Sequence, residues 1–257
     1  MKTACAVCKW FDQPTRVVCE IQMTSENIGL GTTVGRGIVA LMCATTALLL
    51  QPDGAFAQEV GEPAAEVARS GSASGIPACS ACHGSAGEGN PAVGYPRLAG
   101  LPALYLEQQL TELADGTRNN PMMSPIAKLL STGDRTALAG FYASMPAPQT
   151  PNSPSAAKTR NDVGERIALR GNWAEGVPAC VSCHGSNGSG VGDVFPPLAG
   201  QSAIYIRNQI SAWKYGKRAP GPLGLMSTIA RKLSDAEAVG VADYFAAQSP
   251  VAKGETP

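Results

Sequence analysis

The sequence predicts an all-α fold in which one small helical domain occurs twice. Three observations lead to this prediction. Apolar residues recur at helical spacing in several stretches, and no stretch alternates apolar and polar residues as a half-buried strand would. The second part of the chain repeats the first in matching order. Each repeat also contains the same short cysteine and histidine motif, C-x-x-C-H.

The two copies of this motif are Cys79-Ser80-Ala81-Cys82-His83 and Cys180-Val181-Ser182-Cys183-His184, each followed by glycine. C-x-x-C-H is typical of covalent haem attachment in c-type cytochromes. Two thiols add to the haem vinyl groups, and the histidine takes one axial position on the iron. On a helix these three residues stand at i, i+3 and i+4, so they share one face of a turn. We therefore predict two covalently bound haem c groups, attached through Cys79, Cys82, Cys180 and Cys183, with His83 and His184 as iron ligands.

Two other kinds of site explain the motif less well. A structural zinc site needs about four Cys or His ligands. The chain has only two histidines, both inside the motifs, and one site built from both copies would leave two of the six residues unused. A thioredoxin-like C-x-x-C predicts neither the histidine nor the second copy. Aromatic residues make up only 5% of the chain, which is few for two small cores, and a buried haem would add apolar mass to each.

Residues 1–57 are predicted to be an N-terminal extension and a secretory signal peptide. The apolar run at 37–50 follows Arg36, and Ala55-Phe56-Ala57 forms an A-x-A cleavage site. The run is shorter than the about 20 residues of a transmembrane helix. We expect cleavage after Ala57 and a periplasmic protein, with an uncleaved anchor left open. Met23 would be a more economical start than Met1, and no function is assigned to the cysteines before it.

The repeat divides the remaining chain into domain 1 at 58–148, a Pro/Ser-rich linker at 149–161 and domain 2 at 162–257. Amphipathic spacing and end signals predict one long helix after each motif and another near the end of each half. Ser234 opens the last of these with a capping box. The helices expected in the two halves are 63–70, 102–115 and 134–144, then 162–170, 202–215 and one that starts after Ser234.

The second axial ligand of each iron is predicted to be methionine, because no spare histidine exists. After the second motif the only methionine is Met226. In the first half Met122, Met123 and Met145 compete. The repeat pairs Met123 with Met226, and Met145 follows the last helix, so we select Met123 and keep Met122 as the alternative.

These residues and motifs resemble the dihaem cytochrome c4 family. The resemblance covers the predicted exported portion, through the two C-x-x-C-H-G motifs, the Pro-x-Leu-Ala-Gly segments and the Met…Ile-Ala…Leu-Ser segments. It implies two class-I cytochrome c domains with facing haems, each iron held by histidine and methionine. The implied metal ligands are His83 with Met123, and His184 with Met226.

The resemblance also suggests roles for residues around the irons. It implies that the carbonyls of Pro96 and Pro196 accept the proton on the other nitrogen of each ligand histidine. Arg118 and Arg218 either pair with haem propionates or are solvated surface residues. The two halves differ where Gly100-Leu101 corresponds to Gly200-Gln201.

An iron with both axial positions filled cannot bind a substrate, so the predicted function is electron transfer without catalytic residues. The implied role is an electron carrier between a respiratory donor complex and a terminal oxidase or similar acceptor. An electron-accepting subunit of a dehydrogenase complex is the main alternative. A dihaem peroxidase is the enzyme alternative, and it would need an iron with an open or displaceable position.

The charge pattern bears on the partners. Twenty basic and twenty acidic residues give no electrostatic case for nucleic-acid binding and no polybasic membrane patch, although peripheral membrane association stays open. Residues 58–150 carry 8 acidic and 5 basic residues, whereas residues 151–257 carry 8 acidic and 11 basic. The halves should therefore form a dipole of about −3 and +3, and we expect them to favour different docking partners.

Overall fold

The computed structural model describes residues 7–8, 19–20, 61–148 and 162–250. The chain forms two units, Met1–Pro52 and Asp53–Pro257. In the first unit, Val7–Cys8 (β1) pairs antiparallel with Cys19–Glu20 (β2), and Cys8 lies opposite Cys19. The predicted signal peptide, its cleavage site and the linker at 149–161 lie outside the described residues.

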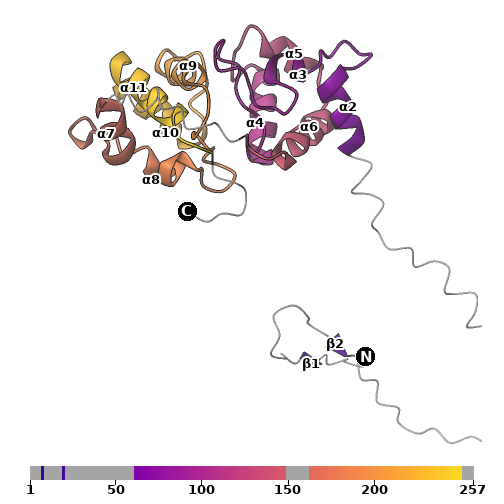
Figure 1. Ribbon diagram of the computed structural model, residues 1–257, viewed down its shortest axis with the longest axis horizontal. Helices are drawn as coiled ribbons and strands as arrows, with labels where there is room; N and C mark the ends of the chain where they lie inside the picture. Colours follow the sequence, from indigo (N-terminus) through magenta and orange to yellow (C-terminus); the bar gives the residue numbers. More distant parts are fainter. Residues whose placement is uncertain (1–6, 9–18, 21–60, 149–161, 251–257) are drawn as a thin grey trace, which may run out of the picture. The chain divides into compact units, whose positions relative to one another are not determined.

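The second unit consists of two sets of helices in the same order (Figure 1). The all-α prediction is confirmed, and the only strands among the described residues are the two-residue pair β1 and β2. Both sets belong to one compact unit, so the domain bounds 58–148 and 162–257 stay a prediction. The first set is α2 (Gly61–Ser70), α3 (Ser80–His83), α4 (Ala103–Asp115), α5 (Met123–Leu129) and α6 (Thr132–Ser144). The second is α7 (Asp162–Arg170), η1 (Trp173–Glu175), α8 (Val181–His184), η2 (Ser186–Gly188), α9 (Ala203–Lys214), η3 (Pro222–Gly224), α10 (Leu225–Lys232) and α11 (Asp235–Ala246).

Local sequence sets the ends of these helices. Helix α4 ends at Gly116, whose φ of 87° is a left-handed conformation that suits glycine. The Ser234–Glu237 capping box at the start of α11 is confirmed. Helix α6 starts at Thr132, two residues before the predicted start, because Ser131 and Asp134 form a second capping box. No helix among the described residues has the length and apolar character needed to cross a membrane.

Each half has its own apolar core around its last helix. In the first half α2 and α4 pack on α6, and in the second α7 and α9 pack on α11. Helices α7 and α11 approach closely at Gly164, where a side chain would meet the backbone of Gly240. Among the side chains that the structure describes, the largest fully buried ones are Phe245, Ile167 and Val177. Burial of such side chains contributes about 1.5–3 kcal/mol each, so the two cores hold the helices that carry the motifs.

The two halves meet at an interface of buried polar side chains. Arg118 donates hydrogen bonds to the Tyr205 hydroxyl (3.0 Å), to Gln209 Oε1 (2.9 Å) and to Gln109 Oε1 (3.0 Å). Arg218 donates to the same two glutamines and lies 3.6 Å from a Glu112 carboxylate oxygen.

Both arginines are buried, with 8% and 7% exposure for Arg118 and Arg218, and their backbones form an antiparallel bridge. The solvated alternative for these two residues is therefore wrong. A buried guanidinium is tolerated only where hydrogen bonds satisfy it, and here both arginines are satisfied across the interface. Their pairing with haem propionates stays a prediction.

Candidate haem-binding sites

The motif helices place the attachment residues on one turn in each half. Cys79 and Cys180 precede α3 and α8 with helical backbone angles. The amide of His83 donates to the carbonyl of Cys79 and that of His184 to the carbonyl of Cys180, both at 2.9 Å. This is the i to i+4 bond of an α-helix, so the predicted grouping of two cysteines and one histidine on a single turn is present in both halves.

The backbone fixes the tautomer of both histidines. Nδ1 lies 2.9 Å from the Pro96 carbonyl oxygen in His83 and 2.9 Å from the Pro196 carbonyl oxygen in His184. A carbonyl only accepts, so Nδ1 carries the proton and Nε2 carries the lone pair. Burial lowers the pKa of His83 and of His184 and outweighs the opposite effect of the carbonyl. Both rings are therefore neutral imidazoles with an available nitrogen, the form that binds iron.

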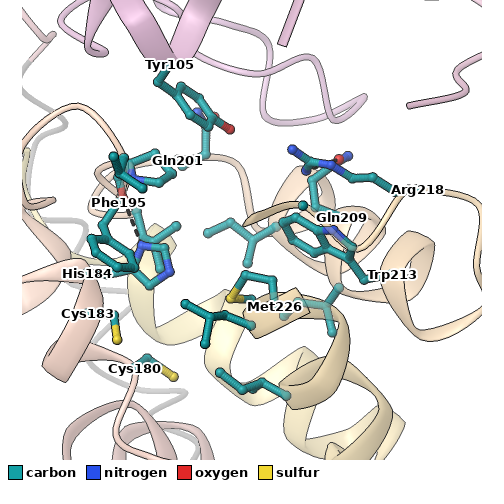
Figure 2. A pocket seen from close by; sticks show the side chains of 18 of the residues that line it. Tyr105, Cys180, Cys183, His184, Phe195, Gln201, Gln209, Trp213, Arg218 and Met226 are labelled. Carbon is teal, nitrogen blue, oxygen red and sulfur yellow. Dashed lines mark hydrogen bonds between the residues drawn. The ribbon is translucent and has the colours of Figure 1, made fainter. Parts of the chain in front are cut away.

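The second half contains a cavity of about 330 Å³ that both predicted iron ligands line. Figure 2 shows His184 and Met226 facing into this cavity from α8 and α10, with Cys180 and Cys183 beside them. Most of the remaining wall is apolar, and it includes Phe195, Leu198, Ile206, Ile210, Trp213 and Ile229. An apolar chamber with two thiols, one imidazole and one thioether fits a covalently attached porphyrin with two axial ligands.

The first cysteine of each motif, Cys79 or Cys180, carries an uncharged thiol at neutral pH. Burial raises the pKa of the Cys180 thiol to about 11 and also raises that of Cys79. Cys79, Cys82, Cys180 and Cys183 are all free and partly buried.

In the first half the structure separates the two competing methionines. Asn120 Oδ1 accepts hydrogen bonds from the amides of Met122 (3.0 Å) and Met123 (2.9 Å), which fixes the backbone at the start of α5. Met122 is 56% exposed, whereas Met123 is partly buried. Met145 follows α6 and packs against the apolar core. These positions favour Met123, and its assignment as ligand stays a prediction.

The methionine loop of the second half is built differently. The residue three positions before Met226 is Leu223, which has a left-handed φ of 56° and is 92% exposed. Gly221 and Gly224 on either side also have positive φ. Glycines and one strained residue therefore shape this loop. In the first half the Asn120 side chain, which accepts two backbone amides, takes that role.

Residues of the first half also line the cavity of the second, which the sequence did not indicate. Tyr105 enters from α4 at one side of the cavity (Figure 2). Leu101, Gln109 and Glu112 contribute to the same wall. No local signal marks these residues, because their contact depends on how the halves pack.

Comparison with known proteins agrees with this geometry. The Cytochrome c family model matches residues 174–248. The chain is 54% identical over 175 residues to the "Thiosulfate dehydrogenase electron acceptor" of Thiomonas intermedia (strain K12), covering 66% of this chain and 78% of that one. It is 34% identical over 169 residues to cytochrome c4 of Pseudomonas aeruginosa, covering 65% and 82%.

Solved structures show the same similarity. A thiosulfate dehydrogenase (TsdBA) from Marichromatium purpuratum superposes with a TM-score of 0.66 at 40% identity, covering 74% of this chain and 40% of that chain. Reduced cytochrome c4 from Pseudomonas stutzeri superposes with a TM-score of 0.62 at 27% identity, covering 73% and 98%. The protein is a dihaem c-type electron carrier with covalently bound haem c, and it belongs to the cytochrome c4 family.

Proposed function

We propose that this protein accepts electrons from a thiosulfate dehydrogenase and passes them to a respiratory acceptor such as a terminal oxidase. One observation carries the choice of donor: the Thiomonas relative at 54% identity is named as an electron acceptor of that enzyme. An electron-accepting partner of a dehydrogenase was the main alternative to a free carrier, and the proposal gives that partner a specific donor. The two roles are compatible, because a reduced acceptor must pass its electrons to another protein before it can accept more.

The proposed iron ligands are His83 with Met123 and His184 with Met226. Bound haem supplies one-electron exchange between Fe(III) and Fe(II). Each histidine is held by a hydrogen bond from its Nδ1 to a proline carbonyl. Met226 faces His184 across an apolar cavity. If these four residues held the two irons, neither iron would keep an open position for a substrate. This arrangement supports a carrier and not a peroxidase.

Reduction of the ferric holoprotein in an anaerobic stopped-flow experiment tests the proposed donor. We expect thiosulfate together with a thiosulfate dehydrogenase to reduce both haems, and thiosulfate alone to reduce neither. Pseudomonas aeruginosa cytochrome c4 is the matched control, and we expect it to be reduced more slowly. If the enzyme reduces this protein no faster than thiosulfate alone does, the proposed donor is wrong.

The strength of the association separates a subunit from a free carrier. A subunit should elute with the dehydrogenase in size-exclusion chromatography at micromolar concentration. A free carrier should elute alone and still be reduced in the kinetic assay.

We also propose that the protein is exported to the periplasm. The apolar run and the A-x-A site before Gln58 support this proposal, as does the need to attach haem covalently to four cysteines. Cell fractionation followed by N-terminal sequencing tests it. We expect a periplasmic chain that starts at Gln58, and a cytoplasmic chain with an intact N-terminus would contradict the proposal.

A further inference from the structure

One glutamine of the second half binds the backbone beside the first half's iron-site histidine. Gln201 Oε1 accepts the amide of Arg97 at 2.9 Å, and Gln201 Nε2 donates to the Arg97 carbonyl at 3.1 Å. These two bonds fix the orientation of the side-chain amide, since the backbone N–H needs an acceptor and the carbonyl needs a donor. Gln201 and Arg97 are 3% and 2% exposed, so water does not compete for these bonds.

These contacts continue to His83 through a single peptide group. The Arg97 N–H and the Pro96 carbonyl belong to the same peptide, and that carbonyl accepts the Nδ1 proton of His83 at 2.9 Å. The result is a hydrogen-bond chain from Gln201 through the peptide to the imidazole. Hydrogen bonds in such a chain polarise one another, with a strengthening of about 10–30% per bond.

The second half cannot make the reciprocal chain. Its corresponding peptide joins Pro196 to Pro197, which has no N–H to donate. Leu101 stands where the second half has Gln201, and its side chain cannot accept a hydrogen bond. The second half therefore lacks both the peptide N–H and the side-chain acceptor of this hydrogen-bond chain. The hydrogen bond between the histidine and the proline carbonyl nevertheless has the same length in each half.

A stronger bond at Nδ1 makes an imidazole a more basic ligand. A more basic ligand stabilises the ferric state of iron and so lowers its reduction potential. We propose that Gln201 is a positioning residue for the other half: it polarises the Pro96–Arg97 peptide, strengthens the His83 hydrogen bond and lowers the reduction potential of the first haem. This inference rests on the proposed role of His83 as an iron ligand. Through this hydrogen-bond chain, Gln201 acts on the first haem and not on the second.

Two substitutions at Arg97 isolate the N–H in the holoprotein. Arg97→Pro introduces the residue that the second half carries and removes the N–H. Arg97→Gln is the matched control, because it also removes the guanidinium, which donates to the carbonyls of Ala99 and Ala199, but it keeps the N–H. Gln201 lines the cavity of the second half and Arg97 does not. The two Arg97 variants therefore leave the wall of that cavity unchanged, whereas Gln201→Leu alters it.

The measurements are redox titration of both haems and NMR of the hyperfine-shifted Nδ1 proton of His83. We expect the Fe(II)/Fe(III) ratio of the first haem, at a fixed potential, to be about threefold higher in Arg97→Pro than in Arg97→Gln. This corresponds to about 28 mV, since a tenfold ratio is 59 mV for one electron. The second haem should have the same potential in both variants, and the His83 proton should exchange faster in Arg97→Pro. Gln201→Leu should shift the first haem in the same direction.

Equal first-haem potentials in the two Arg97 variants, or equal shifts of both haems, would overturn the proposal. A wild-type protein without a hyperfine-shifted His83 proton would instead overturn the ligand assignment on which it rests.

Discussion

Gly188 lies against the core of the second half and allows a direct test of its packing. Its φ is +78°, and a Cβ there would lie 2.6 Å from Phe245 Cδ1 and 3.2 Å from the Ala199 amide nitrogen. Phe245 is fully buried. The Gly188 carbonyl accepts the amides of Leu198 (2.8 Å) and Ala199 (3.0 Å), just after the Pro196 that holds His184. We therefore expect Gly188→Ala to weaken both the core and the support of the iron ligand.

The expected cost has two parts. The left-handed backbone costs an alanine about 1–2 kcal/mol, and the overpacking against Phe245 adds about 1–3 kcal/mol. Gly216→Ala is the control, because its φ is +67° and nothing lies within 4 Å of its Cβ position. Gly216→Ala should therefore lose only the stability that the left-handed backbone costs.

Denaturant unfolding of the holoprotein, followed by circular dichroism, measures both variants. In thermal unfolding each kcal/mol should lower Tm by about 4–8 °C where one half unfolds by itself, and by about 2–4 °C where both halves unfold together. Equal losses of stability in Gly188→Ala and Gly216→Ala would refute the packing argument.

Three further predictions concern the ligands, the helix cap and the charges. Met123→Ala and Met226→Ala should each remove about half of the weak sulfur-to-iron absorbance at the red edge of the spectrum, because each iron contributes one such bond. Met122→Ala should keep the full absorbance. Loss of absorbance in Met122→Ala but not in Met123→Ala would make Met122 the ligand. Hydrogen bonds from the Ser234 amide lower the pKa of Glu237 in the folded protein. The Glu237 carboxylate therefore contributes to folding stability above its unfolded pKa, and this contribution is lost as the pH falls through the lower folded pKa. The stability difference between the wild type and Glu237→Gln should therefore shrink on acidification below about pH 4, and a difference that stays constant to pH 3 would contradict this. Reduction by a charged donor enzyme should vary with ionic strength, and a rate unchanged between about 20 and 200 mM salt would argue against docking guided by the dipole.

The sequence predicted the helices because their signals are local. Apolar spacing predicted the helix at 202–215, which the structure has as α9 with Ser202 as its N-cap. The start of α6 was missed because its capping box uses Asp134 where glutamate or glutamine is usual. The C-x-x-C-H grouping was predictable for the same reason, since the three residues of each motif occupy one turn.

Contacts between the halves were not predictable from the sequence. Gln201 pairs with Arg97 across 104 positions, and Arg118 reaches Tyr205 across 87. A repeat aligns equivalent residues of the two halves, but it does not say which of them meet. The sequence shows the difference between Leu101 and Gln201, but only the structure shows that Gln201 accepts the N–H of the Pro96–Arg97 peptide. Arg118 and Arg218 were open to two interpretations because burial of a charge depends on those same long-range contacts.

Coulometric titration of the exported holoprotein tests the central claim most directly, because it counts the electrons that the chain can carry. A dihaem carrier with both irons closed by histidine and methionine should take up two electrons per polypeptide chain and release both on reoxidation. An uptake of one electron or none by fully matured protein would contradict the account.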